Sequence, residues 1–398
     1  MQQPIFAARR GFQAMVLAVL AGASLLAACS KSNSVITNQP VILPANAITA
    51  TTLAGGAVKG VMLSDSTYII NGNITVLSSD TLTIQPGATI KVNKNAAFYV
   101  QGMIISEGSK DKPITFTTST QQAGDWGGIQ ADSAKYVSFK WTKLLWTGGP
   151  DSSGNPRKTL FVAAPVQVNV WDCWIQGGQD DGIRCQNGAK VSILRNTIDA
   201  QGTTDGEAIN IKTGATGDIA YNVIWGGAGS AIKIETSTTV QIPTTYVRVY
   251  NNTCVDNGFR RGAAEPGRGI LCDAFGSGEF FNNLIVNNYE GLDIAPDANI
   301  AKVTYGNNFF YATVDSLRAG FYPVGSVGKP QSGDIISTGT NNNNPMFITY
   351  TTNPPNPSLR SNPNNFHLQS GSPATGKGNA TYNNDIGAYT SDNKGNQH

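Results

Sequence analysis

The chain has 398 residues, of which 28 are Lys or Arg and 26 are Asp or Glu, so its formal net charge is +2. Charged residues make up 14% of the sequence. A nucleic-acid-binding surface needs a concentration of basic residues, and this composition therefore argues against a nucleic-acid partner. Behind an N-terminal export signal the chain is long enough for one large repeat domain, because repeat architectures grow without dividing into several cores. We expect this domain to be a monomer.

Residues 1–29 have the features of an export and anchoring signal. Two arginines precede an apolar run, which ends in Leu26-Ala27-Ala28-Cys29. This ending resembles the cleavage box of bacterial lipoproteins. The alternatives are an ordinary signal peptide and a transmembrane helix. The apolar run is short for a transmembrane helix. The resemblance implies cleavage before Cys29, lipid on that residue, and anchoring in the bacterial cell envelope, with the outer membrane as the expected membrane.

Residues 30–48 are polar, contain two prolines and show no periodicity. We interpret them as a flexible tether between the lipid and the folded domain. The repeats described below predict a solenoid over residues 49–323. Residues 324–398 are rich in Gly, Pro and Asn, which predicts an irregular segment that caps the solenoid or packs on it.

Residues 50–130 show the first strand signals. Thr81 to Val92 alternates apolar and polar residues, and Pro86-Gly87 supplies a turn. Together with residues 68–76, 102–104 and 124–129, this stretch resembles the N-terminal coils of secreted bacterial proteins of the broad pectate-lyase-like superfamily. The resemblance implies an all-β fold, a right-handed single-stranded parallel β-helix.

Two short motifs alternate between residues 172 and 310. In the first, a small residue precedes an aliphatic one, a spacer and a second apolar residue; its copies are Gly182-Ile183 with Cys185, Ala208-Ile209 with Ile211, Ala231-Ile232 with Ile234, Gly269-Ile270 with Cys272, and Gly291-Leu292 with Ile294. The second is an Asn-x-apolar step; its copies begin at Asn196, Asn222, Asn252, Asn283 and Asn308, with Asp172 as an earlier variant. Apart from one gap, copies recur after roughly 22 to 31 residues, which is typical of solenoids. Stacked coils would place the Asn residues in a hydrogen-bonded ladder.

Four cysteines follow the signal segment: Cys173, Cys185, Cys254 and Cys272. In the register above, Cys185 and Cys272 occupy an inward column that isoleucines fill in other coils, so we expect small buried hydrophobes. Three coils separate them, roughly 14 Å at strand spacing, which exceeds disulfide reach. A structural disulfide among the four is the alternative, since exported proteins often form them.

If the aliphatic residue of each first motif points inward, the next residue points outward. This predicts an outward column of Arg184, Asn210, Lys233, Leu271 and Asp293, with Asp181, Glu207, Lys212, Glu235 and Asp273 beside it or in the adjoining turn. Such a face suits an extended polar substrate. Trp171 and Trp225, each next to a position that points inward, are candidates for stacking on sugars. We therefore expect polysaccharide binding through Arg184, Asn210, Glu235, Asp293, Trp171 and Trp225.

An alternative is a polysaccharide lyase or, less favoured, a glycoside hydrolase. Asp181 or Glu207 would act as acid or base, and Lys212 or Lys233 would stabilise developing charge; Ca²⁺ is a possible cofactor of a lyase. The pair Asp180-Asp181 resembles part of the polygalacturonase pattern, but the Gly-His-Gly and Arg-x-Lys motifs of that branch are missing, as is the dense set of Asp residues of a pectate lyase. Asp180 and Asp181 can equally form a polar turn. A third alternative is a structural or adhesive surface protein, because this scaffold does not determine function.

Two further segments depart from the repeat. Residues 258–269 form a Gly-rich insertion with Arg260, Arg261 and Arg268, which is either part of the binding face or a variable loop. Near the end, residues 366–389 resemble the closing segment of many exported β-helix proteins. His367 lies in that segment, and we expect a structural role for it.

Overall fold

The computed structural model describes residues 46–199, 201–203, 205–237, 244–262, 265–351 and 362–398. The predicted export signal, Cys29 and all but the last residues of the predicted tether lie outside the described residues. No helix among the described residues is long and apolar enough to cross a membrane.

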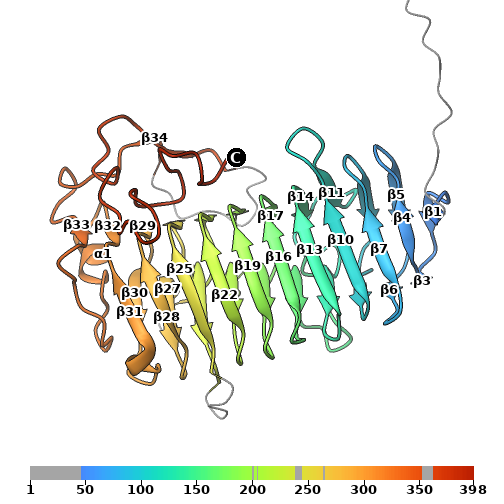
Figure 1. The fold of residues 1–398 in the computed structure, drawn as a ribbon, viewed down its shortest axis with the longest axis horizontal. Helices are drawn as coiled ribbons and strands as arrows, with labels where there is room; N and C mark the ends of the chain where they lie inside the picture. The colour runs from blue at the N-terminus through green and yellow to red at the C-terminus, as the bar shows by residue number, and fades with distance from the viewer. Residues whose placement is uncertain (1–45, 200, 204, 238–243, 263–264, 352–361) are drawn as a thin grey trace, which may run out of the picture. The chain divides into compact units, whose positions relative to one another are not determined.

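Three parallel sheets, here named A, B and C, run along the solenoid, and each takes every third strand of the chain (Figure 1). Sheet A contains β1 (Ala47–Ile48), β4 (Gly60–Met62), β7 (Thr81–Ile84), β10 (Met103–Glu107), β13 (Tyr136–Lys140), β16 (Gln167–Trp171), β19 (Lys190–Leu194), β22 (Thr216–Ala220), β25 (Tyr246–Tyr250), β28 (Ser277–Phe281) and β31 (Val303–Gly306). Sheet B contains β2 (Thr52–Leu53), β5 (Thr67–Ile70), β8 (Thr89–Val92), β11 (Ile114–Thr117), β14 (Thr142–Leu145), β17 (Trp174–Gln176), β20 (Thr197–Asp199), β23 (Val223–Trp225), β26 (Thr253–Val255), β29 (Leu284–Val286), β32 (Phe309–Tyr311) and β33 (Ile335–Ile336). Sheet C contains β3 (Gly56–Ala57), β6 (Ile74–Val76), β9 (Phe98–Val100), β12 (Ile129–Ala131), β15 (Leu160–Val162), β18 (Ile183–Cys185), β21 (Ile209–Ile211), β24 (Ile232–Glu235), β27 (Arg268–Asp273) and β30 (Glu290–Ile294).

The remaining elements are short. They are the 3-10 helix η1 (Ile300–Lys302), the α-helix α1 (Asp315–Ala319) and the antiparallel pair β34 (Phe347–Thr349) and β35 (Asn365–Leu368). One passage of the chain through sheets A, B and C makes one coil. The predicted all-β, right-handed parallel β-helix is confirmed.

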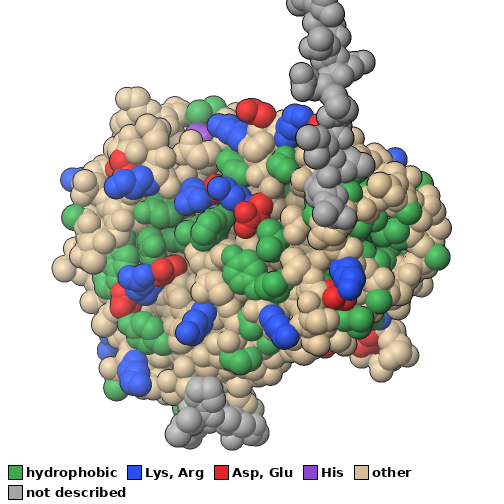
Figure 2. Space-filling model, turned by 45° about the vertical axis from the view of Figure 1, so that its right-hand side comes forward, with side chains coloured by type: hydrophobic (Ala, Val, Ile, Leu, Met, Phe, Trp, Pro, Cys, Tyr) green, Lys and Arg blue, Asp and Glu red, His purple; other side chains and the backbone are tan. Residues whose placement is uncertain are grey.

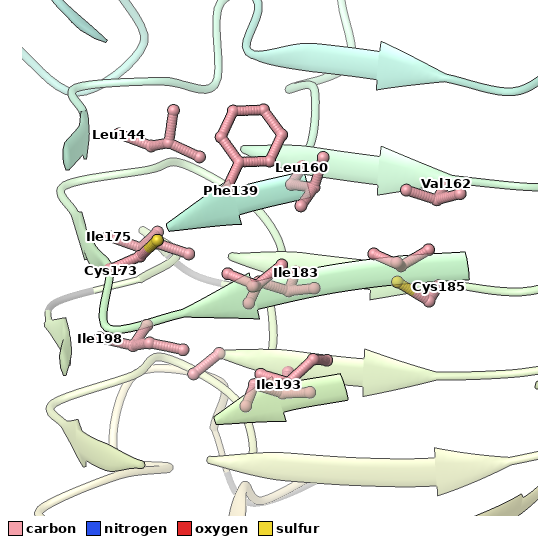
Figure 3. Packing of buried hydrophobic residues seen from close by; sticks show 14 of the residues in the cluster. Phe139, Leu144, Leu160, Val162, Cys173, Ile175, Ile183, Cys185, Ile193 and Ile198 are labelled. Carbon is pink, nitrogen blue, oxygen red and sulfur yellow. The ribbon is translucent and has the colours of Figure 1, made fainter. Parts of the chain in front are cut away.

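The core lies inside the coils, where all three sheets contribute inward side chains. Figure 3 shows Phe139 and Ile193 of sheet A opposite Leu160 and Ile183 of sheet C, and each of the four is fully buried. Burying one such side chain contributes about 1.5–3 kcal/mol. The alternation of apolar residues therefore fixes which face of each strand points inward, because a shift of one residue would expose the whole set.

The predicted cysteine column is also confirmed. Cys185 pairs in register with Ile211, Ile211 with Ile234, and Ile234 with Cys272. All four described cysteines are buried and free of disulfide bonds. Each therefore packs as a small apolar side chain.

The bend between sheets A and B repeats from coil to coil. Asn251 and Asn282, at the start of two such bends, have positive φ angles of 52° and 57°, a conformation that asparagine tolerates better than most residues. The next residue of each bend joins a ladder of fully buried asparagines: Asn196, Asn222, Asn252, Asn283 and Asn308. Each amide donates to the next at 2.9 to 3.1 Å, as the spacing predicts.

The C-terminal segment lies on the outer face of sheet B. Apolar residues of β23 to β32 form a second buried cluster with Phe347, Phe366 and Ile386. Asn251 Nδ2 donates to the backbone oxygen of Asp385 at 2.7 Å. We expected Trp225 to lie on the surface, and this expectation is wrong. Trp225 is 2% exposed, because the C-terminal segment packs over it.

Candidate functional site

The outward column predicted on sheet C exists. Arg184 pairs in register with Asn210, Asn210 with Lys233, and the column continues through Leu271 to Asp293. In the other direction it continues from Arg184 to three residues that the motif search did not include, Phe161, Gln130 and Tyr99.

A groove with a volume of about 750 Å³ lies over the N-terminal part of this column. Its lining includes the column residues Tyr99, Gln130, Phe161 and Arg184, and residues 150–152 and 156–158 from the connection between β14 and β15. Tyr99, Phe161 and Arg184 are half-buried, whereas Gln130 is buried. Aromatic rings and hydrogen-bonding groups are therefore exposed together in one depression.

Two arginines of the groove are held against its rings. Arg157 donates to the hydroxyl of Tyr99 at 3.0 Å and to the backbone oxygen of Gly149 at 3.1 Å. The Arg184 guanidinium lies over the Phe161 ring, 5.9 Å from its centroid. Such contacts orient a guanidinium, which can still donate hydrogen bonds from its free edge.

The remaining charges of the groove are mixed. Lys158 forms an ion pair with Asp180 at 2.6 Å, while Asp132 and Asp151 contribute carboxylates to the lining. Figure 2 shows the same character on one face of the molecule, where Lys and Arg side chains lie beside Asp and Glu in small groups separated by uncharged residues. The groove therefore offers both donors and acceptors of hydrogen bonds to a ligand.

A buried carboxyl pair adjoins the groove along the column. The amide nitrogen of Asn210 lies 3.1 Å from Asp181 Oδ2 and 3.4 Å from Glu207 Oε2, and the Glu207 backbone N–H donates to Asp181 Oδ1 at 2.8 Å. The three side chains are 2 to 4% exposed. Burial, followed by the nearby negative charge of Glu207 and Asp180, raises the pKa of Asp181 well above its usual range.

Two lysines lie near this pair: Lys212 directly follows β21, and Lys233 is the column residue of β24 in the next coil. Glu235 forms ion pairs with Lys212 and, at 3.1 Å, with Lys233, which is also 3.6 Å from Asp273. Burial alone would raise the pKa of Glu235, but Lys233 and Lys212 outweigh burial and lower it. Burial raises the pKa of Asp273 to about 6 although Lys233 opposes this.

The arginines of the insertion brace this region. Arg261 forms an ion pair with Glu207 and another with Asp205 at 3.1 Å. Arg268 contacts Asp293 at 3.1 Å and Glu290 at 2.9 Å. The insertion therefore lies on the sheet C side, where Arg261 neutralises one member of the carboxyl pair.

The structure brings most of the predicted site residues together. Asp181, Glu207 and Asn210 are in contact; Lys212, Lys233 and Glu235 are in contact; Arg184 and Asp293 lie in the same column. The two tryptophans do not join them. Trp225 is buried on sheet B, and Trp171 ends a strand of sheet A, where its Nε1 donates to Ser192 Oγ at 2.8 Å.

Among the described residues no group of three or more His, Cys, Asp or Glu side chains is arranged to hold a metal ion. The carboxylates of the column instead contact cationic or amide side chains. This donor set does not fit the Ca²⁺ that a lyase mechanism would use.

Two family models match the chain. Residues 55–134 match a pectate-lyase-like β-helix domain, and residues 153–310 match a right-handed β-helix region. A crystal structure of the pectate lyase Pel9A is a distant structural neighbour, with 13% sequence identity and a TM-score of 0.30 over 77% of this chain and 88% of that one. No curated protein matches the chain significantly. With the three stacked parallel sheets, the two models identify the chain as a right-handed parallel β-helix protein.

Proposed function

We propose that this chain is a lipid-anchored cell-envelope protein that binds polysaccharide along the outward column of sheet C. The groove carries this proposal, because Tyr99 and Phe161 are accessible there beside Arg157 and Arg184. Aromatic rings offer apolar surface to a sugar ring, while the arginines donate hydrogen bonds to its oxygens. The pectate-lyase-like description of the matched N-terminal model agrees with a polysaccharide ligand.

The geometry of the solenoid favours an extended ligand. Successive residues of the column are separated by the strand spacing of about 4.8 Å, so a glycan chain parallel to the column can contact several coils. The column residues lie on strands, which hold their side chains more rigidly than loops do. Binding therefore requires little ordering of the protein.

Affinity electrophoresis of the purified protein through gels that contain acidic or neutral polysaccharides tests the proposal. We expect retardation by at least one extended glycan and none by a control gel. Absence of retardation on a broad panel would contradict polysaccharide binding.

A second candidate function is polysaccharide cleavage, which the contact of Asp181 with Glu207 favours. Burial raises the pKa of Asp181, which suits a carboxyl group for general acid chemistry, and Lys212 or Lys233 would be the charge stabilisers. The pair is nearly inaccessible under Arg261, so cleavage requires the insertion to move.

Turnover assays separate this candidate from binding alone. Unsaturated products would indicate a lyase, and new reducing ends without them a hydrolase. We then expect Asp181→Asn and Glu207→Gln to abolish turnover without changing the circular dichroism spectrum. Full turnover by both variants would exclude the pair from catalysis.

Anchoring through Cys29 rests on the sequence of the cleavage box. We expect metabolic labelling with palmitate to mark the wild-type protein, and Cys29→Ser to release it from the membrane fraction. A variant that stays membrane-bound and labelled would contradict this anchor.

A further inference from the structure

A second cavity, of about 400 Å³, lies between sheet B and the C-terminal segment. Sheet B contributes Trp174, Thr197 and Asp199, and the C-terminal segment contributes Tyr389 and His398. This cavity is separate from the groove of the proposed function, because its floor belongs to sheet B and not to sheet C.

Asp199 is the acidic residue of this cavity and it is 9% exposed. Among the described residues it accepts one hydrogen bond, from Asn362 Nδ2 at 3.4 Å, and forms no ion pair. A buried carboxylate without a cation loses hydration, and one long hydrogen bond replaces that hydration only in part. Its position on the cavity wall makes it available to a cation from outside.

Aromatic side chains line the same cavity as the carboxyl group. Tyr389 stacks on His367 with ring centroids 3.7 Å apart, and Trp174 stacks on His398 at 4.0 Å. An imidazole therefore occupies one face of each larger ring. The ring edges and remaining faces provide apolar and polarisable surface.

None of the described residues that line the cavity is a lysine or an arginine. Burial lowers the pKa of His398 to about 4 and also lowers that of His367, and thus favours the neutral form of both imidazoles. Lys143 lies over the Trp174 ring, 5.1 Å from its centroid, but two coils, about 10 Å, separate its strand from that of Asp199. The described lining therefore offers no counter-charge to an anionic ligand.

We propose that this cavity binds a small organic ammonium ion, with its nitrogen against Asp199 and its carbon atoms against Trp174 and Tyr389. An ammonium ion supplies the charge that Asp199 lacks and interacts favourably with the neighbouring rings. A metal ion is disfavoured, because the described residues do not form a ligand set for one.

Isothermal titration with choline and with its uncharged isostere 3,3-dimethylbutan-1-ol tests this proposal. At pH 8 we expect saturable choline binding at least tenfold tighter than that of the alcohol. Asp199→Asn keeps the side-chain shape and removes the charge, and should weaken choline binding at least tenfold. Asp111→Asn, which changes an exposed acid between β10 and β11, is the matched control and should bind as the wild type does.

The pH profile provides a second readout that needs no variant. Burial raises the pKa of Asp199 to about 7, so the carboxyl group loses its charge below neutral pH. We expect choline affinity to fall about 30-fold between pH 8.5 and pH 5.5, and protonation of His367 would act in the same direction.

Three outcomes would overturn the proposal: equal affinity for choline and the alcohol, unchanged binding by a folded Asp199→Asn variant, or no saturable binding of either choline or n-butylammonium. If circular dichroism shows that Asp199→Asn does not fold, the comparison of choline with the alcohol on the wild-type protein still tests the proposal.

Discussion

At the residue scale, three cysteines, Cys185, Cys254 and Cys272, replace isoleucines in the interior columns, whereas Cys173 takes the position that Asn196 has one coil later. Burial raises the pKa of Cys185 to about 12 and raises the pKa of the other three described cysteines further. A thiol reacts as its thiolate, so neither access nor ionisation favours reaction. We expect these four cysteines to resist Ellman's reagent in the native protein and to react together in denaturant. Rapid reaction of any one of them under native conditions would contradict the observed packing.

Asp199 gives a residue-scale prediction about stability. Its pKa is raised from 3.8 to about 7, so between these values the folded protein holds a proton that the unfolded chain has lost. The contribution of Asp199 to the free energy of unfolding is therefore most favourable below pH 4, and it is lost as the pH rises to 7. Relative to Asp199→Asn, we expect the wild type to lose roughly 2–4 kcal/mol of unfolding free energy over this range. Urea unfolding at several pH values measures it, and a constant difference between the two proteins would contradict the prediction.

At the element scale, the asparagine ladder joins successive coils at the bend between sheets A and B. Asn252 donates to Asn283 and accepts from both the backbone and the side chain of Asn222. Asn252→Ala would leave buried donors without acceptors, and we expect it to cost about 2–4 kcal/mol. Asn93→Ala is the matched control, because its hydrogen bond to Asn71 is exposed, and it should change stability by less than about 0.5 kcal/mol. Equal effects of the two substitutions in urea unfolding would show that the ladder adds nothing specific.

The strands of the middle part of sheet C can be predicted from the sequence. The small-aliphatic motif marks strands such as β18 and β21, and alternation places Arg184 and Asn210 outward, as the structure has them. The aromatic floor of the groove was not predicted, because neither strand fits the motif fully. Phe98 stands in place of the aliphatic residue before Tyr99, and Thr159 stands in place of Gly or Ala before Leu160. Extending the alternation to Phe98–Val100 and Leu160–Val162 would have placed both in the column.

Contacts between distant segments explain what the sequence did not predict. The alternation of apolar and polar residues predicts that the Trp225 side chain points out of the coil, but it does not predict what covers that side chain. The covering residues lie more than 120 positions later in the chain. Arg157 lies in a connection without periodicity, so no pattern indicates that it reaches Tyr99.

At the scale of the whole described domain, the three sheets have different surroundings. The C-terminal segment covers β23 to β32 of sheet B, and the insertion braces the carboxyl pair of sheet C, whereas the groove at Tyr99 and Phe161 remains accessible. The domain thus offers a groove on sheet C for an extended ligand and a smaller cavity on sheet B for a small one. Each makes a separate prediction, so failure of one leaves the other testable.

The central claim is that the sheet C groove binds the glycan. Affinity electrophoresis of Phe161→Ala beside Tyr136→Ala, a matched aromatic substitution on sheet A, tests this claim most directly. We predict that Phe161→Ala weakens retardation at least fivefold, because it removes a ring and the support of Arg184, and that Tyr136→Ala migrates as the wild type does. Equal retardation of all three proteins by a glycan that binds the wild type would show that the binding site lies elsewhere.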